Sequence, residues 1–116
     1  MPYFEFLIAV KKKDISAIDQ IMADEIYSSV VESDGTRRNL DRPALLHVIE
    51  NKVMETCNWD FDIVYKTNAQ ERILAFIEVS REIEESDRKE KVVWFMTFHR
   101  SGKSYKLVSF YTEELE

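Results

Sequence analysis

Few side chains in this sequence have the types and spacing that acid–base or metal chemistry requires. The two histidines, His47 and His99, lie 52 positions apart (99 − 47 = 52), and neither has a carboxylate motif beside it. The histidine and cysteine ligands of a metal site normally recur at short spacing. We therefore expect no metal and no cofactor, with His47 on a helix surface and His99 at an interface or a hairpin end.

Asp60 and Asp62 alternate with aromatic residues, so a strand would place both carboxylates on one face. A pair of this kind could act as general acid and base, or hold a cation. Charged pairs also mark the solvated face of an edge strand, where they discourage pairing with another chain. We favour the edge-strand interpretation.

Arg42 stands beside Pro43 at the expected start of a helix. Its guanidinium could pair with a local acid or carbonyl, or it could meet an anionic group of a ligand. The sequence holds no glycine-rich phosphate loop, since its only glycines are Gly35 and Gly102.

The composition favours one folded domain over residues 1–116. Apolar residues make up 45% of the chain and charged residues 33%, with 16 basic against 22 acidic side chains and a net charge of −6. An acidic chain is not expected to bind nucleic acid or an anionic membrane surface, which need a basic footprint. Glu5 interrupts the first apolar run, and lysines follow that run rather than precede it, unlike a secretory leader. With Cys57 as the single cysteine, we expect a cytoplasmic protein.

Helical spacing of apolar residues dominates the first half of the chain. Asp14 and Asp41 stand where N-caps are expected, and a short strand is predicted over 26–31, followed by a turn around Gly35. The predicted helices cover residues 3–12, 14–22 and 41–53. Residues 23–25 are expected to end the second helix.

The second half alternates apolar and polar residues with a period of two, which predicts strands. The charged segment 84–91 is expected to be a solvated hairpin tip, and the acidic tail Glu113, Glu114 and Glu116 to fray. The predicted strands cover 59–66, 72–82, 92–99 and 104–112. This order predicts an α+β fold, with three N-terminal helices packed in a strongly curved antiparallel sheet.

Both faces of the central strands are apolar, although an antiparallel sheet that faces water should show one polar face. Alternation sorts strand 92–99 into Trp94, Met96 and Phe98 on the inner face and Val93, Phe95, Thr97 and His99 on the outer face. Counting from the turn at Gly102 adds Leu107, Ser109 and Tyr111 to the inner face, and Val108 and Phe110 to the outer face. An exposed apolar face usually marks an interface. We therefore predict a homodimer through the outer face.

The order of elements resembles the nuclear transport factor 2-like superfamily, and in particular its small SnoaL-like and ketosteroid-isomerase-like members. The match rests on Ala23-Asp24-Glu25 at the end of the second helix, Ser33-Asp34-Gly35 with Asp41-Arg42 before the third, and Ser101-Gly102-Lys103 in the final hairpin. The resemblance implies a cone-shaped α+β barrel, also described as a cystatin-like roll, with a pocket between sheet and helices. It also implies dimers through the convex sheet.

The resemblance places the three polar groups of the isomerases near Phe6, Val30 and Trp94, all apolar here. Apolar groups cannot exchange a proton, so no catalytic residue is assigned. The main hypothesis is a dimer that binds a small hydrophobic molecule. The alternatives are a SnoaL-like isomerase, hydratase or cyclase acting on a polyketide- or steroid-like compound, and a protein-partner module with a filled cone. The pocket candidates are Tyr27, Arg42, Trp94, Met96, Phe98, Leu107, Ser109 and Tyr111.

Overall fold

The chain begins with helices that the sequence positions through proline and aspartate. The computed structural model describes residues 1–115. Asp14 and Asp41 act as N-caps, and their carboxylates accept hydrogen bonds from the N–H groups of Ala17 and Ala44, both at 3.0 Å. Both predicted caps are confirmed, as are all three helices. These are α1 (Pro2–Lys11), α2 (Ile15–Ile21) and α3 (Arg42–Glu55).

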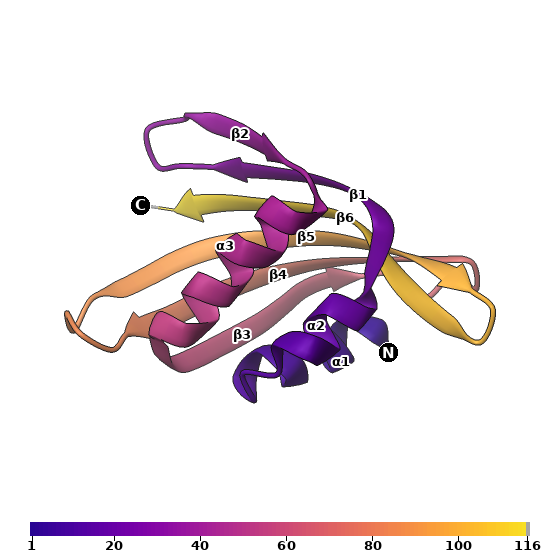
Figure 1. The fold of residues 1–116 in the computed structure, drawn as a ribbon, viewed down its shortest axis with the longest axis horizontal. Helices are drawn as coiled ribbons and strands as arrows, with labels where there is room; N and C mark the ends of the chain where they lie inside the picture. Colours follow the sequence, from indigo (N-terminus) through magenta and orange to yellow (C-terminus); the bar gives the residue numbers. More distant parts are fainter. Residues whose placement is uncertain (116) are drawn as a thin grey trace.

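Six strands form one sheet that curves around the helices (Figure 1). Their order across the sheet is β2-β1-β6-β5-β4-β3, and every neighbouring pair is antiparallel except β1 with β6, which is parallel. The α+β class with a curved sheet is confirmed, although the sheet is mixed rather than purely antiparallel. The strands are β1 (Met22–Val31), β2 (Arg37–Leu40), β3 (Thr56–Lys66), β4 (Arg72–Ile83), β5 (Lys89–Ser101) and β6 (Ser104–Leu115).

The core lies between the helices and the inner face of the sheet. Alternate residues of β4 and β5 are buried, as the period of two predicted. Side chains from the helices pack against these strand residues, and each is less than 10% exposed. These helical core residues are Tyr3, Phe6, Leu7, Val10, Ile18, Leu45, Ile49 and Val53.

The first two strands differ from the sequence prediction. β1 begins at Met22 rather than Ile26, because α2 ends one residue earlier and the chain turns directly into the sheet. β2 was not expected, since its sequence Arg-Arg-Asn-Leu is short, and its first three residues are polar and exposed. It pairs only with β1 and forms one edge of the sheet.

None of the helices in the described part of the chain is long and apolar enough to cross a membrane.

A β-bulge in β6 reverses the predicted faces of its second half. Phe98 pairs with Leu107 and Thr97 with Ser109, so Val108 is an extra residue in the ladder. Every side chain after Val108 therefore changes face relative to simple alternation. Glu113 and Glu114 belong to β6 rather than to a frayed tail, and Glu116 lies outside the described residues.

Candidate functional site

Aromatic side chains occupy the interior of the cone. The Trp94 ring lies at the centre of this group, edge-on to Phe6 with 5.8 Å between ring centroids. The other three rings lie 5.6 to 5.7 Å from Trp94. Aromatic pairs at these separations are favourable, so the interior is a packed core. Those three rings belong to Trp59, Phe61 and Phe110.

A small cavity of about 30 Å³ remains between α3 and the sheet, with room for about two water molecules. Its walls are mainly apolar, and Trp59 is among them with a buried indole N–H that has no hydrogen-bond partner. The side chains around the cavity are Val30, Leu45, Val48, Ile49, Lys52, Val53, Trp59, Arg81, Glu90, Val92, Trp94, Phe110 and Thr112.

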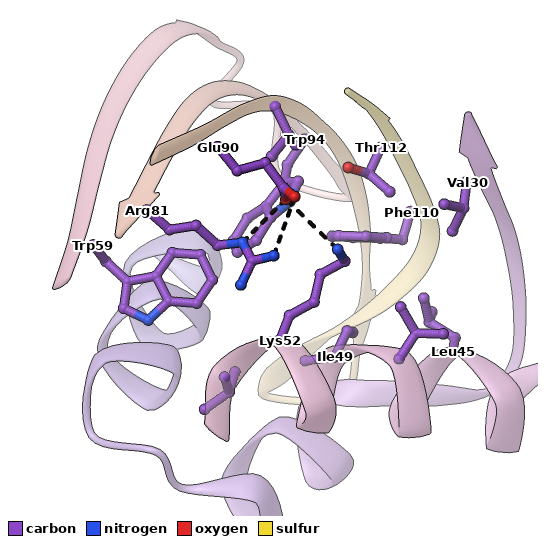
Figure 2. A pocket seen from close by; sticks show the side chains of 13 residues that line it. Val30, Leu45, Ile49, Lys52, Trp59, Arg81, Glu90, Trp94, Phe110 and Thr112 are labelled. Carbon is purple, nitrogen blue, oxygen red and sulfur yellow. Dashed lines mark hydrogen bonds and ion pairs between the residues drawn. The ribbon is translucent and has the colours of Figure 1, made fainter. Parts of the chain in front are cut away.

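An ion cluster borders this cavity. The Arg81 side chain is only 3% exposed and contacts both Glu90 carboxylate oxygens, from Nε at 3.0 Å and Nη2 at 3.1 Å. Its Nη1 donates to Thr56 Oγ1 at 2.9 Å and lies 2.9 Å from Glu55 Oε1. Figure 2 shows Lys52 extending from α3 toward Glu90, with 3.6 Å between Nζ and Oε1. Each charged side chain of the cluster therefore has a partner of opposite charge within the cluster.

Cross-strand pairing brings the cluster together. Arg81 continues the inward series of β4, and register places it directly opposite Glu90 of β5. Sequence reasoning missed Arg81 although it lies within the predicted strand 72–82, and it missed Glu90 because 84–91 was expected to be a solvated tip, whereas β5 already begins at Lys89. The signal was present in the alternation, since position 81 follows Val79 by two.

The cluster shifts the pKa values of its members in opposite directions. Burial alone would raise the pKa of Glu90, but hydrogen bonds from Arg81 and the charges of Lys52 and Arg81 outweigh it, so the pKa of Glu90 is lowered. Burial likewise opposes the charge of Arg81, yet Glu90 and Glu55 raise the pKa of its guanidinium. Both groups therefore remain charged at neutral pH.

A lowered folded-state pKa makes the contribution of Glu90 to stability depend on pH. The carboxylate stabilises the fold above its unfolded pKa of about 4.3, and this contribution is lost as the pH falls through the lower folded-state value. We expect the free energy of unfolding of the wild type to exceed that of Glu90→Gln by a constant amount at pH 6–7. The difference should shrink below about pH 4, as measured by urea denaturation at fixed protein concentration. A difference that stays constant down to pH 3 would contradict this assignment.

The predicted pocket residues fall into two groups. Trp94 borders the cavity, whereas Met96, Phe98 and Leu107 are buried in the core and do not contact it. The prediction of an inward position is wrong for the other three strand residues. Ser109 and Tyr111 face outward because of the bulge at Val108, and Tyr27 is 79% exposed on β1.

Arg42 joins α3 to the end of α2 and does not border the interior cavity. Its Nη1 donates to the Asp19 carboxylate oxygen Oδ1 at 2.6 Å, and its Nη2 donates to the backbone oxygen of Asp19, also at 2.6 Å. Its Nε donates to the carbonyl of Ala23 at 3.0 Å. The pairing of Arg42 with a local acid and carbonyls is confirmed, and its placement in the pocket is wrong.

The outer face of the sheet carries a continuous series of apolar and small side chains, which we call the outer strip. Phe76 and Phe95 contact each other edge-on at its centre, with ring centroids 6.0 Å apart. Phe110, predicted for this face, instead packs inward against Trp94. The outer strip consists of Leu74, Phe76, Val93, Phe95, Thr97, Ser109 and Tyr111.

The remaining candidates for chemistry lie apart on the surface. His47 is exposed on α3, and His99 is exposed near the β5–β6 turn. Asp60 and Asp62 are exposed on β3, which forms an edge of the sheet. Cys57 is also exposed, and among residues 1–115 no group of three or more His, Cys, Asp or Glu side chains is placed to hold a metal ion.

No protein-family model and no curated protein matches the sequence. Several solved structures have a fold similar to that of this chain. A nuclear transport factor 2-like protein of unknown function from Shewanella baltica has a TM-score of 0.77 at 14% identity, over 99% of this chain and 89% of that one. A second such protein, from Silicibacter pomeroyi, has a TM-score of 0.76 at 13% identity, over 98% and 90%.

A third similar structure is a ketosteroid isomerase-like protein from Erwinia carotovora atroseptica. Its TM-score is 0.71 at 12% identity, over 99% of this chain and 92% of that one. Identities this low establish architecture, whereas activity depends on the site. The chain therefore has the nuclear transport factor 2-like fold that its sequence predicted.

Proposed function

We propose that the protein is a non-catalytic interaction domain that works as a cytoplasmic homodimer, with the outer strip as its interface. The outer strip carries this proposal, because it places Phe76, Phe95 and Tyr111 together on the face of the sheet opposite to the one that packs against the helices. Contiguous apolar patches of this kind mark interfaces, and two-fold pairing of identical patches buries them with one contact.

The interior supports binding or packing better than proton transfer. Phe6, Val30 and Trp94, the positions that the resemblance assigns to isomerase chemistry, are all buried and apolar. The titratable groups nearest the cavity, Arg81 and Glu90, already pair with each other. A general acid or base needs a free proton position within reach of a substrate.

Binding of a small hydrophobic molecule is the second candidate function. The apolar walls of the cavity favour it, as does the unpartnered indole N–H of Trp59, which could donate to a ligand acceptor. At about 30 Å³ the cavity must widen first, by displacement of α3 or of cavity side chains. Native mass spectrometry of freshly purified protein provides the test. A co-purifying small molecule would favour this candidate, and bare protein would count against it.

Replacing Phe95 with glutamate tests the interface. The substitution places a charge at the centre of the outer strip, and we expect the dimer dissociation constant to rise at least about 30-fold, or about 2 kcal/mol. Sedimentation velocity over a concentration series measures this change. Ile8→Glu is the matched control, because Ile8 is 51% exposed and lies on α1, which packs against the inner side of the sheet. An unchanged dimer in Phe95→Glu would refute this interface.

A further inference from the structure

The ladder between β1 and β6 is interrupted near the end of α2. Met22 of β1 pairs with Leu107 of β6, and the next pair along the two strands is Tyr27 with Ser109. Four residues of β1 therefore stand opposite a single residue of β6, the bulged Val108. β1 bends sharply in this stretch (Figure 1), and its extra length separates the two strands. Bulges of this kind are common beside active sites, where they redirect side chains.

A surface cleft of about 460 Å³ lies at this interruption, and it is separate from the cavity beneath α3. Its volume falls within the range of small-molecule sites. One wall comes from the β5–β6 hairpin and contains His99, Arg100 and Lys106. The other wall comes from α2 and the start of β1 and contains Asp19 and Asp24. The two walls of the cleft therefore differ in charge.

The hairpin wall belongs to a row of basic side chains. Register pairs His99 of β5 with Lys106 of β6 on one side and with Arg72 of β4 on the other. Paired residues project to the same face of a sheet, with about 5 Å between neighbouring Cβ atoms. We call these three side chains the basic row. Segment 99–106 contains no acidic residue, although the net charge of the chain is −6.

The basic row has hydrogen-bond donors left for a ligand. The Lys106 ammonium uses one of its three donors on the backbone oxygen of Gln20, which holds this side chain at the cleft. Within residues 1–115, neither Arg72 nor His99 forms an ion pair with a carboxylate. The positive charge at this wall is therefore not neutralised by the fold itself.

The opposite wall carries little free negative charge. The Asp19 carboxylate already accepts a hydrogen bond from Arg42, which also lines the cleft. Asp24 is exposed and is the second acidic residue of this wall. Its carboxylate would oppose a second negative charge on a ligand. An anionic group is therefore favoured at the hairpin wall rather than throughout the cleft.

We propose that this cleft binds the phosphate group of a small molecule, with the basic row as its anchor. A phosphate monoester carries a charge of about −1.5 to −2 at neutral pH and three strong acceptor oxygens. A carboxylate offers one charge and two oxygens, so a phosphate matches three basic side chains better. Ala23 and Val108 provide apolar surface in the same cleft for a small organic group. The site is built from one chain and does not depend on the homodimer proposed above.

Inorganic phosphate tests the site through the two histidines. At about pH 7 and constant ionic strength, the ring NMR signals of His99 should shift and saturate with a dissociation constant of about 1–5 mM. Those of His47, which is exposed on α3 and does not line the cleft, should stay in place. Sodium chloride at the same ionic strength should move neither set of signals. Equal shifts at both histidines, or shifts that do not saturate, would overturn the proposal.

Neutral substitutions in the basic row test its contacts with the anion. Arg72→Gln and Lys106→Gln should each weaken phosphate binding at least about fivefold, because each removes a charge-assisted hydrogen bond. Arg72 is exposed, so Arg72→Gln keeps the test valid even if the loss of the Lys106 contact with Gln20 disturbs the fold. Arg88→Gln is the matched control, because Arg88 is exposed between β4 and β5 and lies outside the cleft.

Asp24→Asn should change the affinity in the opposite direction. Removing this carboxylate removes its repulsion of the anion, and we expect phosphate binding to strengthen about twofold to threefold. The same His99 titration measures all four variants. If Arg72→Gln binds phosphate as tightly as the wild type, or if Arg88→Gln weakens binding as much as Arg72→Gln does, the cleft is not the phosphate site. Weaker binding in Asp24→Asn would also count against it.

Discussion

Replacing Glu90 with alanine is expected to lower the free energy of unfolding by about 3–5 kcal/mol. Arg81 would lose a carboxylate that contacts two of its nitrogens, while its own side chain is only 3% exposed. Removing one member of a buried ion pair leaves the other charge without compensation. Urea denaturation followed by circular dichroism, at one protein concentration for every variant, measures the loss.

Glu55→Ala is the matched control for this effect. Glu55 also contacts Arg81, at 2.9 Å, but its side chain is 48% exposed, so water can replace the carboxylate. We expect a loss below about 1 kcal/mol. The double substitution Arg81→Met and Glu90→Leu should recover most of the stability that Glu90→Ala removes, because it leaves no buried charge. Equal losses for Glu90→Ala and Glu55→Ala would show that the cluster is not a buried pair.

Trp94→Ala is expected to lower the free energy of unfolding by about 3–5 kcal/mol. The indole is the centre of the aromatic group inside the cone and is 7% exposed, so its removal enlarges the existing cavity. Added indole should occupy that space and restore part of the stability in proportion to its concentration. Thermal denaturation with increasing indole measures the recovery.

Trp59→Ala controls for the loss of a tryptophan in general. Trp59 lies on the edge strand β3 and is only half-buried, so we expect a smaller loss of stability and no recovery with indole. If Trp94→Ala lost less than about 1.5 kcal/mol, the interior would be loosely filled, and the small-molecule function would gain support over the packed core.

The overall fold was predictable because it depends on patterns that repeat. Helix spacing, the caps at Asp14 and Asp41, and the turn glycines Gly35 and Gly102 each determine local structure, and both glycines do have positive φ. β2 was missed because three of its four residues are polar and exposed, and its only strand partner is β1. Its position depends on that neighbouring strand rather than on a pattern of its own.

The candidate site was harder to predict, because its residues are brought together only by the register in which β4, β5 and β6 pair. A single inserted residue, Val108, decides whether Phe110 or Tyr111 enters the core, and alternation alone cannot locate a bulge. Arg81 and Glu90 were hidden for a related reason. A run of charges usually indicates solvent, and only the pairing of β4 with β5 shows that one of those charges points inward.

The parallel pairing of β1 with β6 has a consequence for the chain during synthesis. One edge of β1 pairs with β2, which follows directly, but the other edge pairs through residues 27–31 with residues 109–113, so that edge must wait until β6 has been translated. At about 5–20 residues per second, the intervening stretch takes roughly 4–16 s to make. Throughout that interval the apolar side chains of α1, α2 and β1 lack the strands that bury them in the finished fold.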